Sequence, residues 1–167
     1  MSEPQERPAL QIDPRGPRFT ASVTLAVFVA VLLTAPSTPG IVLLAVQTAF
    51  FAIGAARGVQ HTPTAYLFKL VVRPRLSAPD HLEDAAPPRF AQTVGLGFSL
   101  VALTGYLVGP TLLGQVAAGF ALAAALLNAV FGFCLGCELY LLLVRARPAG
   151  WKFHPTTNET NKEEVAA

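Results

Sequence analysis

Two long stretches of the chain hold only uncharged, mostly apolar residues, and polar residues gather between and around them. The stretches cover residues 19–56 and 90–137. A helix needs about 20 residues to cross a bilayer core, and each stretch is about twice that long or more. The pattern predicts an integral membrane protein.

Residues that end helices divide each stretch. The first contains Pro36-Ser37-Thr38-Pro39-Gly40 and the second contains Gly109-Pro110. Because proline removes a backbone donor and clashes with the preceding turn, each site predicts a tight hairpin. The predicted fold class is therefore all-α, with four transmembrane helices near 19–35, 41–58, 90–108 and 112–131.

The basic residues are confined to one side of the predicted membrane. None of the 12 Lys and Arg residues lies in either predicted hairpin loop. By the positive-inside rule, both termini and the central segment are predicted to be cytoplasmic, in a multi-pass protein of the cytoplasmic membrane. We expect disordered tails at 1–18 and 148–167, a linker at 76–89, and hairpin units at 19–75 and 90–147.

The two halves share a motif before each hairpin. Asp13 and Pro17-Arg18-Phe19 align with Asp84 and Pro88-Arg89-Phe90. The pattern predicts two parallel hairpin repeats rather than inverted ones. Asp13 and Asp84 are expected to cap or salt-bridge the start of spans one and three.

Each half also closes with a short apolar segment, 64–72 or 138–144, followed by arginines. Such segments are too short to span and predict helices at the membrane interface. The arginines are then expected near lipid phosphates: Arg73, Arg75, Arg145 and Arg147. In the alternative, the fourth helix runs on to Val144 and bends near Gly132 or Gly136.

Cys134 and Cys137 are the only cysteines, at the predicted cytoplasmic edge of the fourth span. Their spacing is typical of dithiol redox centres and of half a metal site. With one such motif, a four-cysteine zinc site within one chain is excluded. Cytosolic thiols are normally reduced, so a permanent structural disulfide is not expected.

The electrostatics of the pair depend on the helix. In a continuous helix, the cysteines lie near its negative end beside Glu138, which disfavours a thiolate. If the helix breaks at Gly136, Cys137 opens a new helix, and the positive end of that helix dipole favours a thiolate. A redox or sulfur-relay thiol, a metal ligand and simple packing all remain open.

Packing is favoured by small residues four positions apart, as in Gly132…Gly136 and Gly54…Gly58, a pattern common at membrane helix interfaces. Gln47, Gln115 and Asn128 are expected to make interhelical hydrogen bonds. No ionisable residue lies deep in a span, which disfavours a transporter. No phosphate loop, nucleophile elbow or zincin motif favours an enzyme, and no cofactor or nucleic-acid partner is predicted.

Three segments together resemble a bacterial membrane family called domain of unknown function 4395: residues 12–19, residues 73–92, and Gly132-Phe133-Cys134-Leu135-Gly136-Cys137-Glu138. The resemblance covers roughly residues 10–148. It implies a small multi-span bacterial protein that is sometimes associated with thioredoxin-like or rhodanese-like proteins. Our hypothesis is a thiol-based accessory in membrane redox or sulfur handling. The alternative is a non-catalytic membrane scaffold or a subunit of a larger membrane complex.

Overall fold

The computed structural model describes residues 10–79 and 81–146. Four long helices dominate it, each of 20 to 22 residues and apolar enough to cross a membrane. They are α1 (Arg15–Thr34), α2 (Thr38–Arg57), α4 (Ala86–Leu107) and α5 (Thr111–Phe131). The predicted all-α fold, with four helices long and apolar enough to span a membrane, is confirmed.

Helices α1 and α4 begin four residues earlier than the predicted spans, at Arg15 and Ala86. Their first turns contain Pro17 and Pro87, respectively. Proline is tolerated in a first turn because the N–H that it lacks has no intrahelical partner there. The Pro-Arg pairs Pro17-Arg18 and Pro88-Arg89, which we placed just before the spans, are therefore already helical.

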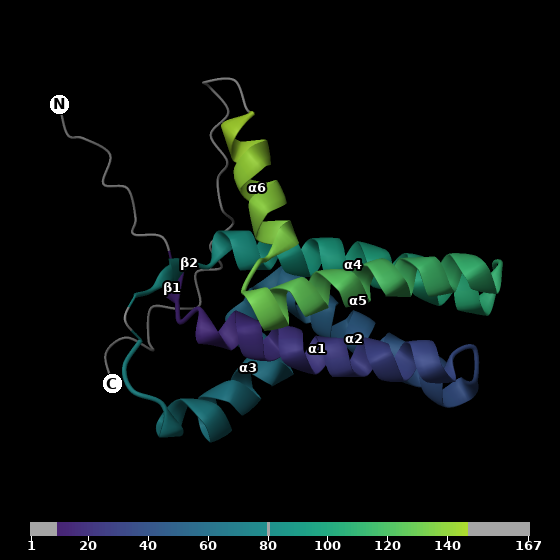
Figure 1. Ribbon diagram of the computed structural model, residues 1–167, viewed down its shortest axis with the longest axis horizontal. Coiled ribbons are helices and arrows are strands. Elements are labelled where there is room, and N and C mark those ends of the chain that lie inside the picture. The colour runs from purple at the N-terminus through teal and green to yellow at the C-terminus, as the bar shows by residue number, and fades with distance from the viewer. Residues whose placement is uncertain (1–9, 80, 147–167) are drawn as a thin grey trace.

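The four helices form a bundle in which both hairpins lie side by side (Figure 1). Helix α1 packs against α2 and α5, and α4 packs against the same two helices. The order around the bundle is therefore α1, α2, α4, α5. Each hairpin therefore packs against both helices of the other. In a bilayer such packing contacts hold helices together, because lipid is as apolar as the side chains and gives no hydrophobic drive.

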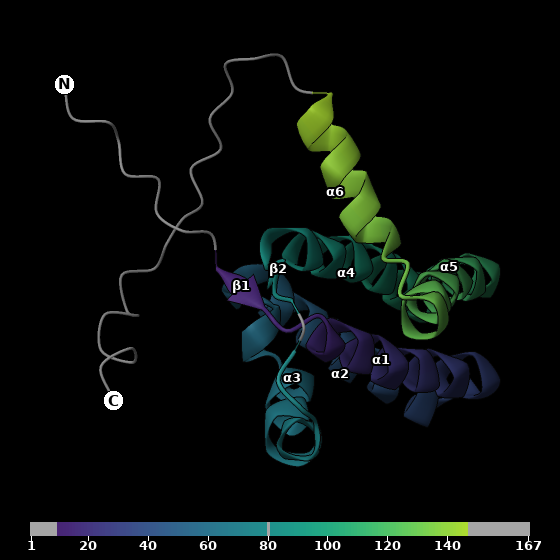
Figure 2. The same cartoon turned by 60° about the vertical axis from the view of Figure 1, so that its left-hand side comes forward.

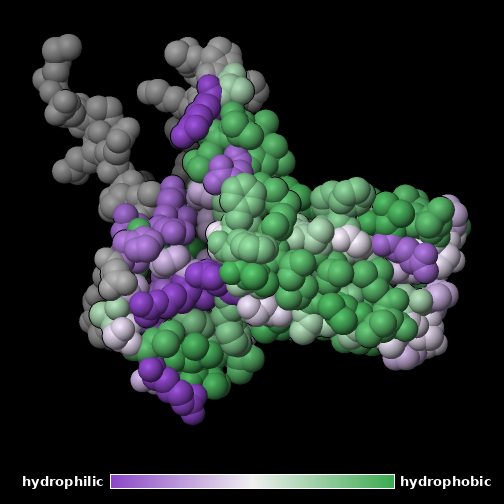
Figure 3. Space-filling model, viewed as in Figure 1, coloured by the Kyte–Doolittle hydropathy of each residue, from purple (hydrophilic) through white to green (hydrophobic). Residues whose placement is uncertain are grey.

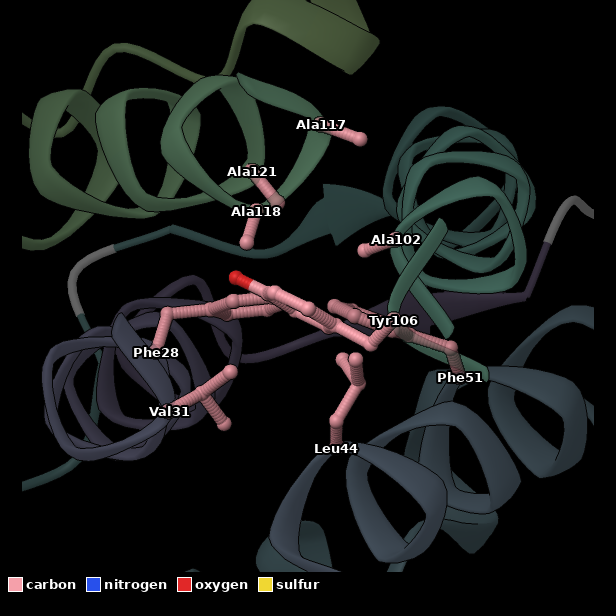
Figure 4. Packing of buried hydrophobic residues seen from close by; sticks show 9 residues of the cluster. All are labelled: Phe28, Val31, Leu44, Phe51, Ala102, Tyr106, Ala117, Ala118 and Ala121. Atoms are coloured by element: carbon pink, nitrogen blue, oxygen red, sulfur yellow. The ribbon is translucent and has the colours of Figure 1, made fainter. Parts of the chain in front are cut away.

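Aromatic rings and alanines fill the centre of the bundle (Figure 4). The Phe28 and Phe51 rings of α1 and α2 lie 6.3 Å apart. Opposite them, α5 presents a row of alanines that lets the helices approach closely. The core cluster comprises Phe28, Val31, Leu44, Phe51, Ala102, Tyr106, Ala117, Ala118 and Ala121.

One polar contact crosses this core. The amide Nε2 of Gln47 in α2 donates to Oγ1 of Thr24 in α1 over 3.3 Å, and both side chains are buried. This confirms the interhelical hydrogen bond predicted for Gln47.

The face of the bundle seen in Figure 3 is mostly apolar, and its hydrophilic residues are most numerous at the end where β1 and β2 lie. These strands, β1 (Gln11–Ile12) and β2 (Glu83–Asp84), pair antiparallel, with Gln11 opposite Asp84. They were not predicted, because two-residue strands are too short to show an alternating pattern. They tie the segment before α1 to the segment before α4.

Two sets of short helices leave the bundle at this same end, on opposite sides (Figures 1 and 2). The first follows α2 and comprises η1 (Val59–His61), α3 (Pro63–Leu67), the π-helical η2 (Phe68–Val72) and η3 (Arg73–Arg75). The second is α6 (Leu135–Arg145). Helix α5 ends at Phe131, so the alternative of one helix running on to Val144 is wrong.

Both sets are anchored by an aromatic pair. Phe19 of α1 lies 5.7 Å from Phe68 of η2, and Phe90 of α4 lies 5.8 Å from Tyr140 of α6, measured between ring centroids. These residues occupy matching places in the two aligned halves. The duplication itself stays a prediction, as does the position of the short helices at a membrane surface.

Candidate functional site: the cysteine pair at the start of α6

The connection between α5 and α6 begins at a glycine in the left-handed region. Gly132 has φ +69°, and its N–H donates to the carbonyl oxygen of Asn128. The Phe133 N–H donates to that of Leu127. A residue with a Cβ atom would be strained here by about 1–2 kcal/mol, so glycine is what allows the chain to stop and turn.

Cys134 is the N-cap residue of α6. Its Sγ accepts a hydrogen bond from the backbone N–H of Cys137 over 3.3 Å. The two Cα atoms are 5.2 Å apart, and the sulfurs are joined in a disulfide. The structure thus describes the oxidised pair, whereas the expectation of reduced thiols rested on the predicted compartment.

The position of the cysteines in the chain decides whether the negative end of one helix or the positive end of the next acts on them. The cysteines do not extend the negative end of α5, because the chain breaks between Phe131 and Leu135. They open α6, where free N–H groups and the helix dipole favour a negative sulfur. The break precedes the Gly136 position that we considered, and Cys134 rather than Cys137 is the cap. Glu138, in the first turn, opposes this influence.

Gly136 docks α6 on α4. A Cβ atom placed on Gly136 would lie 2.6 Å from both Cα and Cβ of Ala91, so only glycine fits. Gly132 and Gly136 therefore do not form a small-residue seam on one helix, because the helix break lies between them. Each has its own role, one in turning the chain and the other in close approach.

Gly54 and Gly58, the other predicted packing pair, also have separate roles. Gly54 faces the Gln92 side chain, which a Cβ atom would approach to 2.7 Å. Gly58 lies beyond the last residue of α2 and ends the helix with φ +97°. Gly54 therefore leaves room for the Gln92 side chain between α2 and α4.

The arginines of the two Pro-Arg-Phe motifs cross to the opposite hairpin. Arg89 donates from Nε to the carbonyl oxygen of Ala55 (2.9 Å) and from Nη2 to that of Ala56 (2.8 Å), at the end of α2. The Arg18 guanidinium lies beside Gly132, at the end of α5, where an added Cβ atom would be 3.5 Å from Cζ. Positive charge at a helix C-terminus is favourable.

The aspartates accept the first N–H groups of α1 and α4. Oδ1 of Asp13 accepts from the Arg15 N–H and Oδ1 of Asp84 from the Ala86 N–H, both at 2.9 Å. Their places are thus those of helix-start residues. Within residues 10–79 and 81–146, neither aspartate forms an ion pair.

The remaining predicted residues do not join the cysteines. Arg73 and Arg75 form the end of the first lateral set, and Arg145 ends α6. Arg147 lies outside the described residues. Among the residues that the structure describes, no three His, Cys, Asp or Glu side chains gather as metal ligands.

A threonine cluster that was not predicted lies at the start of α3. Thr62 Oγ1 accepts from the Ala65 N–H (3.2 Å) and bonds Thr64 Oγ1 (3.1 Å), which in turn accepts from Thr20 of α1 (3.1 Å). The dipeptide Thr62-Pro63 was a readable signal, because threonine at the N-cap and proline at the next position mark a helix start.

Four helices long and apolar enough to cross a membrane, with the Cys134–Cys137 pair at one end of their bundle, are consistent with a multi-pass membrane protein. The chain belongs to the family described as Domain of unknown function (DUF4395), whose model matches residues 12–145. That range includes every helix described above. No curated protein and no solved structure matches the chain.

Proposed function

We propose that Cys134 and Cys137 exchange between dithiol and disulfide as part of membrane redox or sulfur handling. The observation that carries this proposal is the cap geometry, in which the Cys134 sulfur takes the N-cap position and accepts the Cys137 N–H. This arrangement favours the thiolate, which is the reactive form. Both side chains are only half-buried, so a partner can reach them.

The proposed step balances within the two reacting pairs. The Cys134 thiolate attacks one sulfur of a partner disulfide, forms a mixed disulfide and releases the other partner sulfur as thiolate. The Cys137 thiol loses its proton and attacks Cys134, which closes the Cys134–Cys137 disulfide and releases the second partner sulfur. The partner gains two electrons, the cysteine pair loses two, and the reaction runs in either direction.

The proposed location is the cytoplasmic surface of a bacterial membrane, on the basis of the one-sided basic residues. The lateral helices support a surface position, since Leu70 is 77% exposed and Leu142 59% exposed at the end of an apolar bundle. We propose that lipid covers these side chains and that Arg73, Arg75, Arg145 and Arg147 contact its phosphates. The proposed partner is a thioredoxin-like or rhodanese-like protein.

Redox titration tests the proposal. The full chain in lipid nanodiscs would be equilibrated with dithiothreitol mixtures of increasing oxidised fraction, and free thiols would then be trapped by alkylation and counted by mass. We expect one reversible two-electron transition between Cys134 and Cys137. Thiols that stay unpaired, or a disulfide that resists reduction, would contradict thiol exchange.

Trapping identifies the attacking sulfur. Cys137→Ser lacks the resolving thiol, so it is expected to accumulate a mixed disulfide with an oxidised thioredoxin-like protein. The matched control is Cys134→Ser, which is expected to trap little. Equal trapping by both variants would contradict the assigned roles.

The second candidate is a non-catalytic scaffold or complex subunit, favoured by the contact of Gly136 with Ala91. Here the double variant Cys134→Ser/Cys137→Ser would co-purify with the same membrane partners as the native chain. Gly132→Leu, which strains the connection at φ +69°, would lose them. Under the redox proposal, the cysteine variant itself alters the set of disulfide-linked partners.

A further inference from the structure

Arg18 belongs to the first hairpin but lies beside the segment that carries the cysteines. An added Cβ atom on Gly132 would be 3.5 Å from its Cζ and 3.6 Å from its Nε. Cys134 follows Gly132 by two residues, a separation that the backbone spans in at most about 7 Å. The guanidinium therefore lies within about 12 Å of the Cys134 Cα atom. Arg18 is exposed but Cys134 is half-buried, so the interaction between their charges is screened less than that between two exposed charges.

The matching arginine of the other hairpin is engaged differently. Arg89 donates two hydrogen bonds to carbonyl oxygens at the end of α2. At the end of α5, the Gly132 and Phe133 N–H groups already occupy two carbonyl oxygens. Among the described residues, the Arg18 guanidinium makes no hydrogen bond. Its charge faces the α5–α6 connection without being shared with a carbonyl.

Few other charges face the cysteines. Helix α6 carries Glu138, the titratable Tyr140 and, in its last turn, Arg145, and α4 contributes Arg89, which is directed to α2. Helix α5 has no charged residue. Arg15, one turn before Arg18, donates to the carbonyl oxygen of Ser77 (3.0 Å). Arg18 is thus the cation at the α5–α6 connection within the described residues.

We propose that Arg18 is a positioning residue for the cysteine pair, because its guanidinium places a positive charge beside the connection and favours the thiolate form of Cys134. This inference rests on the proposed thiol exchange. The first hairpin would then contribute Arg18 to a dithiol site whose two cysteines follow the second hairpin. The effect is electrostatic, so it depends on the charge of residue 18 more than on its shape.

The test is the pH dependence of alkylation of Cys134 in the reduced full chain, followed by peptide mass spectrometry in nanodiscs. Because the arginine is exposed to screening, Arg18→Gln is expected to raise the pKa of the Cys134 thiol by about 0.3–0.5 unit and to slow alkylation near neutral pH about two- to threefold. Arg18→Lys keeps the charge and is expected to retain most of the native rate.

Arg89→Gln is the matched control. It removes the equivalent arginine and is expected to lower thermal stability while leaving the Cys134 profile unchanged. If Arg18→Gln moves the profile no more than Arg89→Gln, or if Arg18→Lys behaves like Arg18→Gln, the inference is wrong. A native thiol that titrates at the ordinary value of about 8.5 would instead overturn the proposed function, whatever Arg18 does.

Discussion

The starts of α3 and α6 use the same backbone device with different chemistry. At α3, Thr62 Oγ1 accepts the Ala65 N–H over 3.2 Å; at α6, Cys134 Sγ accepts the Cys137 N–H over 3.3 Å. In each case the cap lies three residues before the donor. The cysteine pair therefore occupies a place that the other half of the chain fills with a capping threonine and an alanine.

The surroundings differ more than the caps. Thr64, two residues after the first cap, continues the hydroxyl chain to Thr20 of α1. Gly136, two residues after the second cap, instead presses directly on Ala91 of α4. One helix start is thus closed by buried hydrogen bonds, whereas the other leaves its sulfurs half-buried. Both helix starts therefore need a capping side chain. The candidate site differs from the start of α3 in that its capping atoms are accessible.

The strongest test of this contrast is Gly136→Leu. A side chain here overlaps the Ala91 backbone, so we expect a loss of about 1–3 kcal/mol in the free energy of unfolding and detachment of α6. Thermal unfolding in detergent and proteolysis of α6 would measure both. As a control, Ala91→Gly combined with Gly136→Ala is expected to be more stable than Gly136→Ala alone. Full native stability of Gly136→Leu would argue against this docking.

Moving the pair to α3 sharpens the comparison. Thr62→Cys with Ala65→Cys, made in a Cys134→Ser/Cys137→Ser background, creates the same spacing on the same cap. Because Thr62 is only 1% exposed, we expect its replacement thiol to be alkylated about tenfold more slowly than Cys134 or slower still. Equal alkylation rates would show that the cap alone, and not accessibility, determines reactivity.

Thr62→Ala removes the cap hydroxyl at α3. We expect a loss of about 1 kcal/mol, since the Ala65 N–H loses its acceptor and Thr64 loses a partner. Thr62→Ser is the control and should retain most of the stability. Chemical unfolding of the reconstituted chain would measure the difference, and an unaffected Thr62→Ala variant would refute the role of this cap.

The smallest effect is expected from Glu138→Gln. The carboxylate in the first turn of α6 disfavours a nearby thiolate, so removing its charge should lower the pKa of the Cys134 thiol. Because Glu138 is exposed to screening, we expect a shift of only about 0.3–0.5 unit, measured by the alkylation profile. A shift to higher pKa would contradict the proposed electrostatics.

The amino-acid sequence alone determined the four spans, the hairpin turns and the short lateral helices. It did so because a bilayer makes length, charge and helix-breaking residues decisive. It also located the cysteines at the end of the fourth span. The helix starts at Arg15 and Ala86 were missed because prolines of a first turn read equally well as residues outside a helix.

Only the tertiary structure decided that the cysteines lie at the start of α6 rather than at the end of α5. Glycine at position 132 is compatible with a continuing helix and with a left-handed stop, and the structure has the stop, together with the docking of Gly136 on Ala91. The approach of Arg18 to Gly132 brings together residues far apart in the chain. Local pattern carries no information on such a contact, because it depends on which helix ends the bundle brings together.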